Sequence, residues 1–474
     1  MVHIAHPASH ALSAVLKKLF RSVALVAAVV AVLLPVGNAA WGNEGVDDRG
    51  AVRLLKVIPV PVSAVNNTAG GLYSFDISFV DQSTQTYYLA DRSNKVVDVV
   101  NAKTATFTKP IRATPDFRGF LPCGSGDGNP PAPGANDCAG PNGVVAAFPW
   151  LFVTDAGSRV VTIDLRTDAT VADVVTKVGD PTRADELAYD PRDGLLLVIN
   201  NVQFTGHPPF ATLIRVNKAT GALTVVQNIT LDAAHGVDAQ DGAEQPVWHP
   251  GTGKFFLSIP VIGANDKDGG VVRIDPKTGA IEHTFPIEFC SPAGLTVGPR
   301  NDLLIGCNRV FDTAGNVWST TGTVTAAPKD VILNVKTGAT KDVLGVGAGD
   351  EVWFNEGDGN YYATGSGSPF RPLPAATAKG ATPLGVIDAE NGKLIQLVPT
   401  YNVPALLTGP AAGQHPASTA HSVAANAANN LVFVPIGANN AFSAFAVPNG
   451  GAVPDCEKGC IAVFGHPSED KDED

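Results

Sequence analysis

Seven short stretches of the chain place two residues, mostly polar, directly before an alternating apolar run. They are Phe75-Asp76, Asn142-Gly143, Asp185-Glu186, Glu244-Gln245, Ala293-Gly294, Asp350-Glu351 and His421-Ser422. Five of them carry a carboxylate or an imidazole, and a sixth carries an asparagine. Side chains of these types bind divalent cations or move protons. The chain has no nucleophile elbow, phosphate loop, HExxH pair or dinucleotide fingerprint, so these stretches carry its clearest chemical signal.

Each stretch opens a repeat of two short apolar runs separated by a turn. The clearest copies are Asp76–Asp91 and Glu186–Asn200, and successive repeats start between 43 and 71 residues apart. Paired strands at this spacing are typical of propeller blades, and 49 Gly and 36 Pro supply the many turns they need. The sequence therefore predicts an all-β fold, a single seven-bladed β-propeller.

The two ends of the repeat region complete each other. The apolar run Arg53–Val60 has no innermost strand before it, while the last repeat, from Ser422, is short of one outer run. We expect the N-terminal run to serve as the outer strand of the last blade, which closes the ring and removes exposed edges. The propeller domain then spans residues 41–467, and the charged tail 468–474 is expected to be disordered.

Residues 1–40 have the pattern of a secretory signal peptide. Lys17, Lys18 and Arg21 precede the apolar run Val23–Val36, and small residues follow it. This predicts a secreted or periplasmic protein with no membrane span after the signal is removed. The net charge of −12 argues against nucleic acid as a partner. We expect a monomer whose partner is a small molecule or a protein.

The six cysteines fall into three near-neighbour pairs along the chain. They are Cys123 with Cys138, Cys290 with Cys307, and Cys456 with Cys460. An even count in an exported chain favours disulfides over metal thiolates, and these pairings are favoured among the 15 that six cysteines allow. Cys290 ends one apolar run and Cys307 ends another in the next repeat, so a bridge between them is expected to join adjacent blades.

In a propeller, the residue before each innermost strand points at the mouth of the central channel. The repeat therefore gathers six carboxylates at one opening, where they repel one another unless a cation lies among them or some carry protons. The cation could be one divalent metal (calcium, magnesium, manganese or zinc), or a cationic ligand. Arg183 could neutralise part of the ring or hold an anionic substrate. Alternatively, these side chains are simply solvated, or bond to strand ends of the neighbouring blade.

Two segments resemble blades of the exported YVTN/YncE-like propellers. They are Tyr88–Asp98 and Leu151–Asp164. The resemblance extends over most of the mature chain and implies the fold rather than an activity.

A second, partial resemblance is to the SMP-30/gluconolactonase/strictosidine synthase-like propellers. Glu244-Gln-Pro-Val-Trp248 resembles that family's Glu-Gly-Pro-x-Trp segment, and Pro141-Asn-Gly143 resembles its Pro-Asn-Gly segment. In the family the Glu and the Asn of these segments bind the metal. The resemblance implies that Glu244 and Asn142 are metal ligands.

Two functions follow as hypotheses. In the first, the protein is a metal-dependent hydrolase, lactonase-like, acting on a small molecule. Its expected metal ligands are Glu244, Asn142, Glu351 and Asp76, and its expected catalytic residues are His421, Glu186 and Arg183. In the second, the propeller is not a catalyst and binds a partner protein or small ligand through its channel face and long loops.

Overall fold

The computed structural model describes most of the repeat region. The described residues are 50–68, 70–120, 138–180, 182–201, 208–317, 328–347, 349–365, 383–398, 400, 420–438, 445–446, 452–453, 456 and 458–467. All of them belong to one unit, Gly45–Asp474. The predicted signal peptide, Cys123 and the acidic tail lie outside the described residues, so those three predictions stay predictions. No helix among the described residues is long and apolar enough to cross a membrane.

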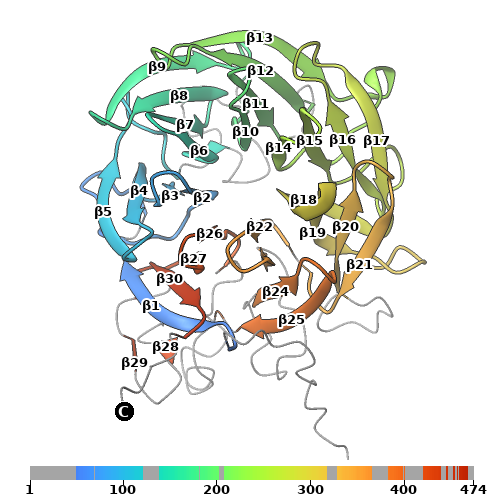
Figure 1. Ribbon diagram of the computed structural model, residues 1–474. Helices are drawn as coiled ribbons and strands as arrows, with labels where there is room; N and C mark the ends of the chain where they lie inside the picture. Colours follow the sequence, from blue (N-terminus) through green and yellow to red (C-terminus); the bar gives the residue numbers. More distant parts are fainter. Residues whose placement is uncertain are drawn as a thin grey trace, which may run out of the picture. The chain divides into compact units, whose positions relative to one another are not determined.

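Seven four-stranded antiparallel sheets form a ring, as predicted for a seven-bladed β-propeller (Figure 1). The first six blades, each in order from the innermost strand outward, are β2 (Ser78–Asp81), β3 (Thr86–Asp91), β4 (Val96–Asn101) and β5 (Thr106–Ile111); β6 (Val144–Ala147), β7 (Trp150–Asp155), β8 (Arg159–Asp164) and β9 (Ala169–Val175); β10 (Leu187–Asp190), β11 (Leu195–Asn200), β12 (Phe210–Val216) and β13 (Leu223–Thr230); β14 (Pro246–His249), β15 (Lys254–Ile259), β16 (Gly269–Ile274) and β17 (Ile281–Ile287); β18 (Cys290–Val297), β19 (Asp302–Val310), β20 (Lys329–Asn334) and β21 (Thr340–Leu344); β22 (Glu351–Asn355), β23 (Asn360–Thr364), β24 (Leu384–Asp388) and β25 (Lys393–Val398).

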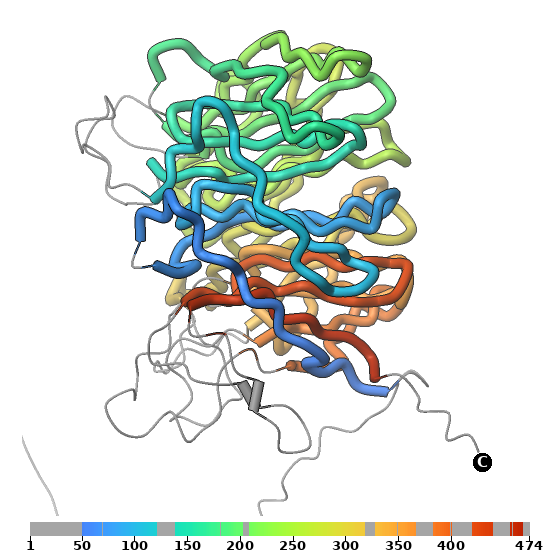
Figure 2. The backbone as a smooth tube through the Cα atoms, turned by 90° about the vertical axis from the view of Figure 1, so that its left-hand side faces the viewer, coloured from blue at the N-terminus to red at the C-terminus, as the bar shows by residue number. Residues whose placement is uncertain are grey.

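The seventh blade joins the two ends of the repeat region. It consists of β26 (Ala424–Asn426), β27 (Leu431–Ile436), β30 (Cys460–Gly465) and, outermost, β1 (Arg53–Pro59). Strand β1 pairs with β30 from Arg53 opposite Gly465 to Pro59 opposite Cys460. Figure 2 shows this N-terminal segment in blue beside the red C-terminal strand. The predicted closure by the N-terminal strand is thus confirmed: β1 covers the outer edge of β30 and completes a four-stranded last blade.

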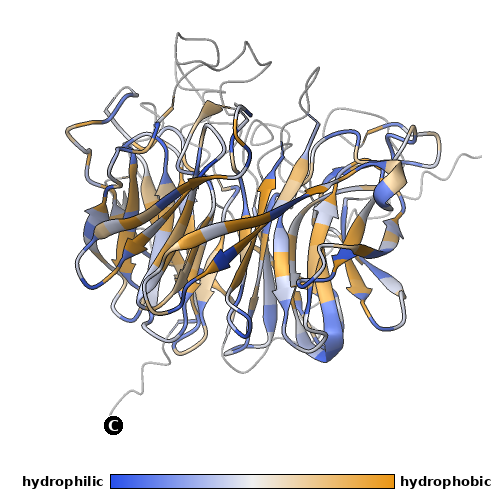
Figure 3. Cartoon of the chain, turned by 90° about the horizontal axis from the view of Figure 1, so that it is seen from above, coloured by the Kyte–Doolittle hydropathy of each residue, from blue (hydrophilic) through white to orange (hydrophobic). Residues whose placement is uncertain are grey.

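Apolar side chains pack between neighbouring blades rather than around one centre. Trp150 and Phe152 of the second blade, for example, share a buried cluster with Leu196 and Val198 of the third. Strand β11 is buried along its whole length, whereas the outer strand β9 alternates exposed and half-buried residues. Figure 3 shows the same division as apolar strand segments between hydrophilic ends. Each blade therefore depends on both neighbours for its core.

Two of the three predicted disulfides lie within the described residues, and both are present. Cys290 bonds Cys307 with Cα atoms 5.2 Å apart, and Cys456 bonds Cys460 with Cα atoms 5.0 Å apart. The expectation that the first bridge joins adjacent blades is wrong. Cys290 begins β18, and Cys307 lies in its partner β19, so the bond stays within the fifth blade. Strand β18 is bulged and starts four residues before the predicted repeat start at Gly294, which explains the error.

Candidate functional site

A repeated backbone hydrogen bond places the predicted residues at one end of the ring. In each of five blades, a residue one or two positions before the innermost strand donates its N–H to the carbonyl of the last or next-to-last residue of the second strand. The pairs are Asp76 to Ala90, Asn142 to Thr154, Asp185 to Ile199, Glu244 to Ser258 and Asp350 to Thr364, with N···O distances of 2.7–3.0 Å. Because the blades are repeats, the same local pairing points these side chains at the same mouth of the channel.

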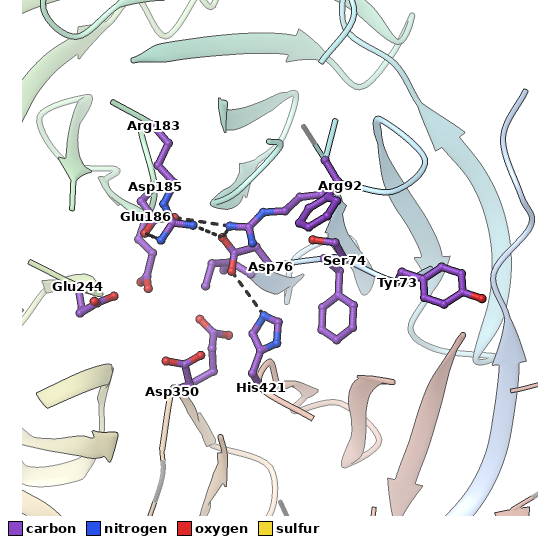
Figure 4. Close-up of a pocket in the computed structure, with 14 residues that line it drawn as sticks. Tyr73, Ser74, Asp76, Arg92, Arg183, Asp185, Glu186, Glu244, Asp350 and His421 are labelled. Carbon is purple, nitrogen blue, oxygen red and sulfur yellow. Dashed lines mark hydrogen bonds and ion pairs between the residues drawn. The ribbon is translucent and has the colours of Figure 1, made fainter. Parts of the chain in front are cut away.

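The mouth holds a pocket of about 410 Å³. Six of the predicted site residues line it, namely Asp76, Arg183, Glu186, Glu244, Glu351 and His421. Asp185, Asp350 and Arg92 also line it, with the aromatic residues Tyr73, Phe75 and Phe120. The seventh predicted residue, Asn142, lies behind the wall and bonds to Arg92. Figure 4 shows Glu244 and Asp350 across the opening from Arg92.

A buried arginine organises one wall of this pocket. The side chain of Arg92 is 2% exposed, forms an ion pair with Asp76, and donates from Nε to Asn142 Oδ1 at 2.9 Å. Burial alone would raise the pKa of Asp76, but the charge of Arg92, a hydrogen bond from His421 and the charge of Arg183 outweigh it. The pKa of Asp76 is therefore held well below its usual value. Asp76 is therefore the ionised partner of Arg92 in a buried ion pair.

Arg183 completes the same wall. Its Nη2 lies 2.7 Å from Asp185 Oδ2, and its Nη1 lies 3.9 Å from Asp76 Oδ2. Arg92 Nη2 lies 4.0 Å from Asp185 Oδ1. Burial still raises the pKa of Asp185 to about 7, against the opposing charges of Arg183 and Arg92. Of the two roles foreseen for Arg183, the geometry shows the neutralising one.

The opposite wall consists of carboxyl groups, of which Glu244 lies within reach of the charge of Arg183. Among the described residues, no Lys or Arg nitrogen forms an ion pair with Glu186, Glu244 or Glu351. Glu351 accepts hydrogen bonds from Gln245 Nε2 and Ser422 Oγ, each at 3.0 Å. Glu186 is 7% exposed, and its Oε2 has no hydrogen-bond partner in the described part of the chain. Such an uncompensated group is costly when charged.

Proton binding relieves that cost. Burial, followed by the charges of Asp185 and Asp350, raises the pKa of Glu244 to about 8. Burial and neighbouring carboxylates also raise the pKa values of Glu186 and Glu351 well above normal. The repulsion within the acidic ring is thus relieved in two ways: arginines form ion pairs on one wall, and the carboxyl groups of the other wall bind protons more tightly than free carboxyl groups do.

His421 stands between the two walls. Its ring stacks on Phe75 with centroids 4.6 Å apart and planes 4° apart. Its Nε2 lies 3.5 Å from Asp76 Oδ1, and its Nδ1 is buried with no hydrogen-bond partner among the described residues. The stacking and the Asp76 contact fix the orientation of the imidazole.

Glycines occupy the second position of the stretch in the two blades that bring neither an acid nor a histidine to the mouth. A Cβ on Gly143 would lie 2.6 Å from the carbonyl oxygen of Asp185, and one on Gly294 would lie 2.9 Å from that of Asp350. Gly143 also donates its N–H to the Asp185 carbonyl at 2.8 Å. The backbone of the next blade approaches too closely at these positions for a side chain.

The donor set on the arginine wall does not suit a metal. Both polar groups of Asn142 are in use, since Oδ1 accepts from Arg92 and Nδ2 donates to the Ala184 carbonyl at 2.7 Å. Asp76 faces the same guanidinium. Among the described residues, no three His, Cys, Asp or Glu side chains form a group that could hold a metal ion. Metal binding by Glu244 and Glu351 stays a prediction.

Arg92 is the functional residue that the sequence reasoning missed. It follows strand β3 directly, at the end where that strand meets the start of β2 through the Asp76–Ala90 hydrogen bond. The same hairpin logic that located Asp76 would have located Arg92, had the residue after each second strand also been considered. Asp185 and Asp350 stood in the predicted stretches without an assigned role.

Comparisons with known proteins support the fold alone. No family model matches the sequence, and no curated protein matches it. Solved structures do match, among them hydrazine synthase of Kuenenia stuttgartiensis, with 13% identity and a TM-score of 0.52 over 78% of this chain and 95% of that one. At this identity the likeness shows a shared propeller architecture alone. The YVTN/YncE-like and SMP-30-like resemblances therefore stay resemblances.

Proposed function

We propose that the channel mouth binds a small organic cation, such as a primary amine. The supporting observation is the wall of Glu186, Glu244 and Glu351, in which Glu186 and Glu351 are buried and none of the three forms an ion pair within the described part of the chain. An ammonium group donates three hydrogen bonds and carries the charge that this wall lacks. Arg92 and Arg183 hold Asp76 and Asp185 in ion pairs, so these two carboxylates do not compete with the Glu wall for the ligand.

The proposed binding is coupled to proton release. An incoming ammonium favours the ionised carboxylates, so it lowers the pKa values that burial had raised and displaces protons into solvent. Below pH 8, where Glu244 is protonated in the free protein, this release weakens binding. The affinity should therefore rise with pH toward about 8 and level off above it.

The proposal is tested by titrating the mature protein with ethylammonium chloride in a calorimeter at pH 8. Glu244→Gln keeps the shape but not the charge, and we expect it to weaken binding about tenfold or more. Glu356, in the exposed turn after β22, provides the matched control Glu356→Gln, which should bind as the wild type does. Tight binding of propionate instead, or a Glu244→Gln variant equal to wild type, would exclude a cation site.

A hydrolase is the second candidate, supported by the Asp76–His421 pair. A carboxylate that contacts one imidazole nitrogen orients the ring, and His421 lines the pocket where a substrate would lie. Under this hypothesis the protein opens simple lactones, with Glu186 and Arg183 in supporting roles and Glu244 and Glu351 holding a divalent metal. Lactone hydrolysis that His421→Ala abolishes and a chelator suppresses would favour it. Equal rates of lactone hydrolysis by the wild type and His421→Ala would rule out the hydrolase hypothesis.

A further inference from the structure

A second cavity of about 660 Å³ lies along the inner face of the ring. The innermost strands β2, β6, β10, β14, β18 and β22 all contribute to its wall. Its side chains are mainly apolar and aromatic, as represented by Phe79, Val145, Tyr189, Trp248 and Trp353. Its volume falls in the range of small-molecule sites, roughly 300–1,000 Å³. Unlike the acidic pocket, it offers an occupant hydrophobic contact rather than charge.

The two cavities meet inside the channel. Ile77 and Glu186 line both of them. Glu186 is the carboxyl group whose buried Oε2 lacks a hydrogen-bond partner among the described residues, so an unsatisfied acceptor stands at the junction. A ligand that spans the junction can satisfy this oxygen from the acidic side and continue along the apolar side.

The other polar side chains beside this junction already form hydrogen bonds with one another. Ser422 Oγ bonds Ser78 Oγ at 2.8 Å and Glu351 Oε2 at 3.0 Å. Gln245 in turn joins Glu351 Oε1 to the backbone N–H of Leu295. These bonds anchor neighbouring innermost strands to one another and leave Glu186 as the acceptor still open at the junction.

We infer that the ligand is an amphipathic amine, with its ammonium group among Glu186, Glu244 and Glu351 and its apolar chain in the second cavity. This inference rests on the proposed cation site and specifies its substrate class. Because the blades enclose the channel on its sides, the occupant lies along the ring axis, and an unbranched alkyl chain suits that shape. Burying each methylene tightens binding about fourfold.

The test is a calorimetric series of ethyl-, butyl- and hexylammonium with the mature protein. From ethyl to hexyl the dissociation constant should fall about 200-fold, with 1-hexanol binding far more weakly than hexylammonium. Equal affinities along the series, with ethylammonium still bound, would overturn the inference and leave the cation site standing. No binding by any amine would instead refute the cation site itself. Hexanol bound as tightly as hexylammonium would overturn the assignment of the head group.

A variant series checks the location of the chain. Val145→Phe narrows the second cavity and should remove most of the gain in affinity from ethylammonium to hexylammonium. Val226→Phe, on the exposed face of the outer strand β13, is the matched control and should keep the full gain. If Val145→Phe preserves the gain, the chain does not lie in this cavity. Should that variant fail to fold, the chain-length series on the wild type still decides.

Discussion

Removing the guanidinium of Arg92 should strongly destabilise the protein. Arg92 is 2% exposed and holds both Asp76 and Asn142. The variant Arg92→Met keeps much of the side-chain volume but leaves a buried carboxylate without its main partner. Breaking a buried ion pair from one side costs about 3–5 kcal/mol. Arg183 at 3.9 Å and His421 at 3.5 Å still face Asp76, so we expect a value near the lower end, about 3 kcal/mol.

Urea unfolding at pH 7 measures this loss against a matched exposed pair. Arg112 and Asp116 also form an ion pair, but their side chains are 49% and 47% exposed, so Arg112→Met should cost less than about 1 kcal/mol. Adding Asp76→Asn to Arg92→Met should recover part of the stability, because the stranded charge is gone. A loss below about 1 kcal/mol for Arg92→Met, or no recovery in the double variant, would refute the view that Arg92 organises this wall.

Two further predictions concern other buried positions. Asp330 is fully buried and accepts a hydrogen bond from the Cys307 N–H at 3.0 Å. Burial raises the pKa of its carboxyl group to about 7, so the folded state must hold a buried negative charge once the pH exceeds 7. Because this carboxyl group binds its proton more tightly in the folded state, its contribution to the free energy of unfolding falls as the pH rises from about 4 to 7. Asp330→Asn should therefore be more stable than the wild type at pH 8.5, by up to about 4 kcal/mol, and about as stable as the wild type at pH 4. Asp266→Asn, in an exposed turn, should show no such pH-dependent gain, and an equal gain there would contradict the cause. Gly143→Ala should lower the unfolding free energy by about 1–3 kcal/mol, because its Cβ would lie 2.6 Å from Leu187 Cδ2; unchanged thermal unfolding would show that the neighbouring blade can yield.

The sequence contained the blade pattern because local rules produce it. Alternating apolar runs and turn residues specify antiparallel strands, and the missing outer run of the last repeat was matched by Arg53–Val60. The end of the ring at which Asp76, Glu186, Glu244 and Glu351 meet followed from the same repeat. The strand pattern and the end of the ring at which these side chains meet both depend on residues that are close together in the sequence.

The electrostatic state of the site depends on contacts between blades, which the sequence does not show. Arg92 reaches Asn142 of the next blade, and Asp185 of the third blade lies near it. These distances decide which carboxylates are ionised. The bulge in β18 likewise hid the true start of the fifth blade and led to the wrong placement of the Cys290–Cys307 bridge.

The number of protons released on binding tests the central claim most directly. Ethylammonium is titrated into the protein at pH 7 in phosphate and in HEPES, neither of which is a primary amine, and the difference in heat gives the protons exchanged with buffer. Because burial raises the pKa of Glu244 to about 8, and the pKa values of Glu186 and Glu351 are also raised, the account predicts release of about one proton or more per bound amine. Binding with no proton release, and with an affinity that does not change between pH 6.5 and 9, would contradict it.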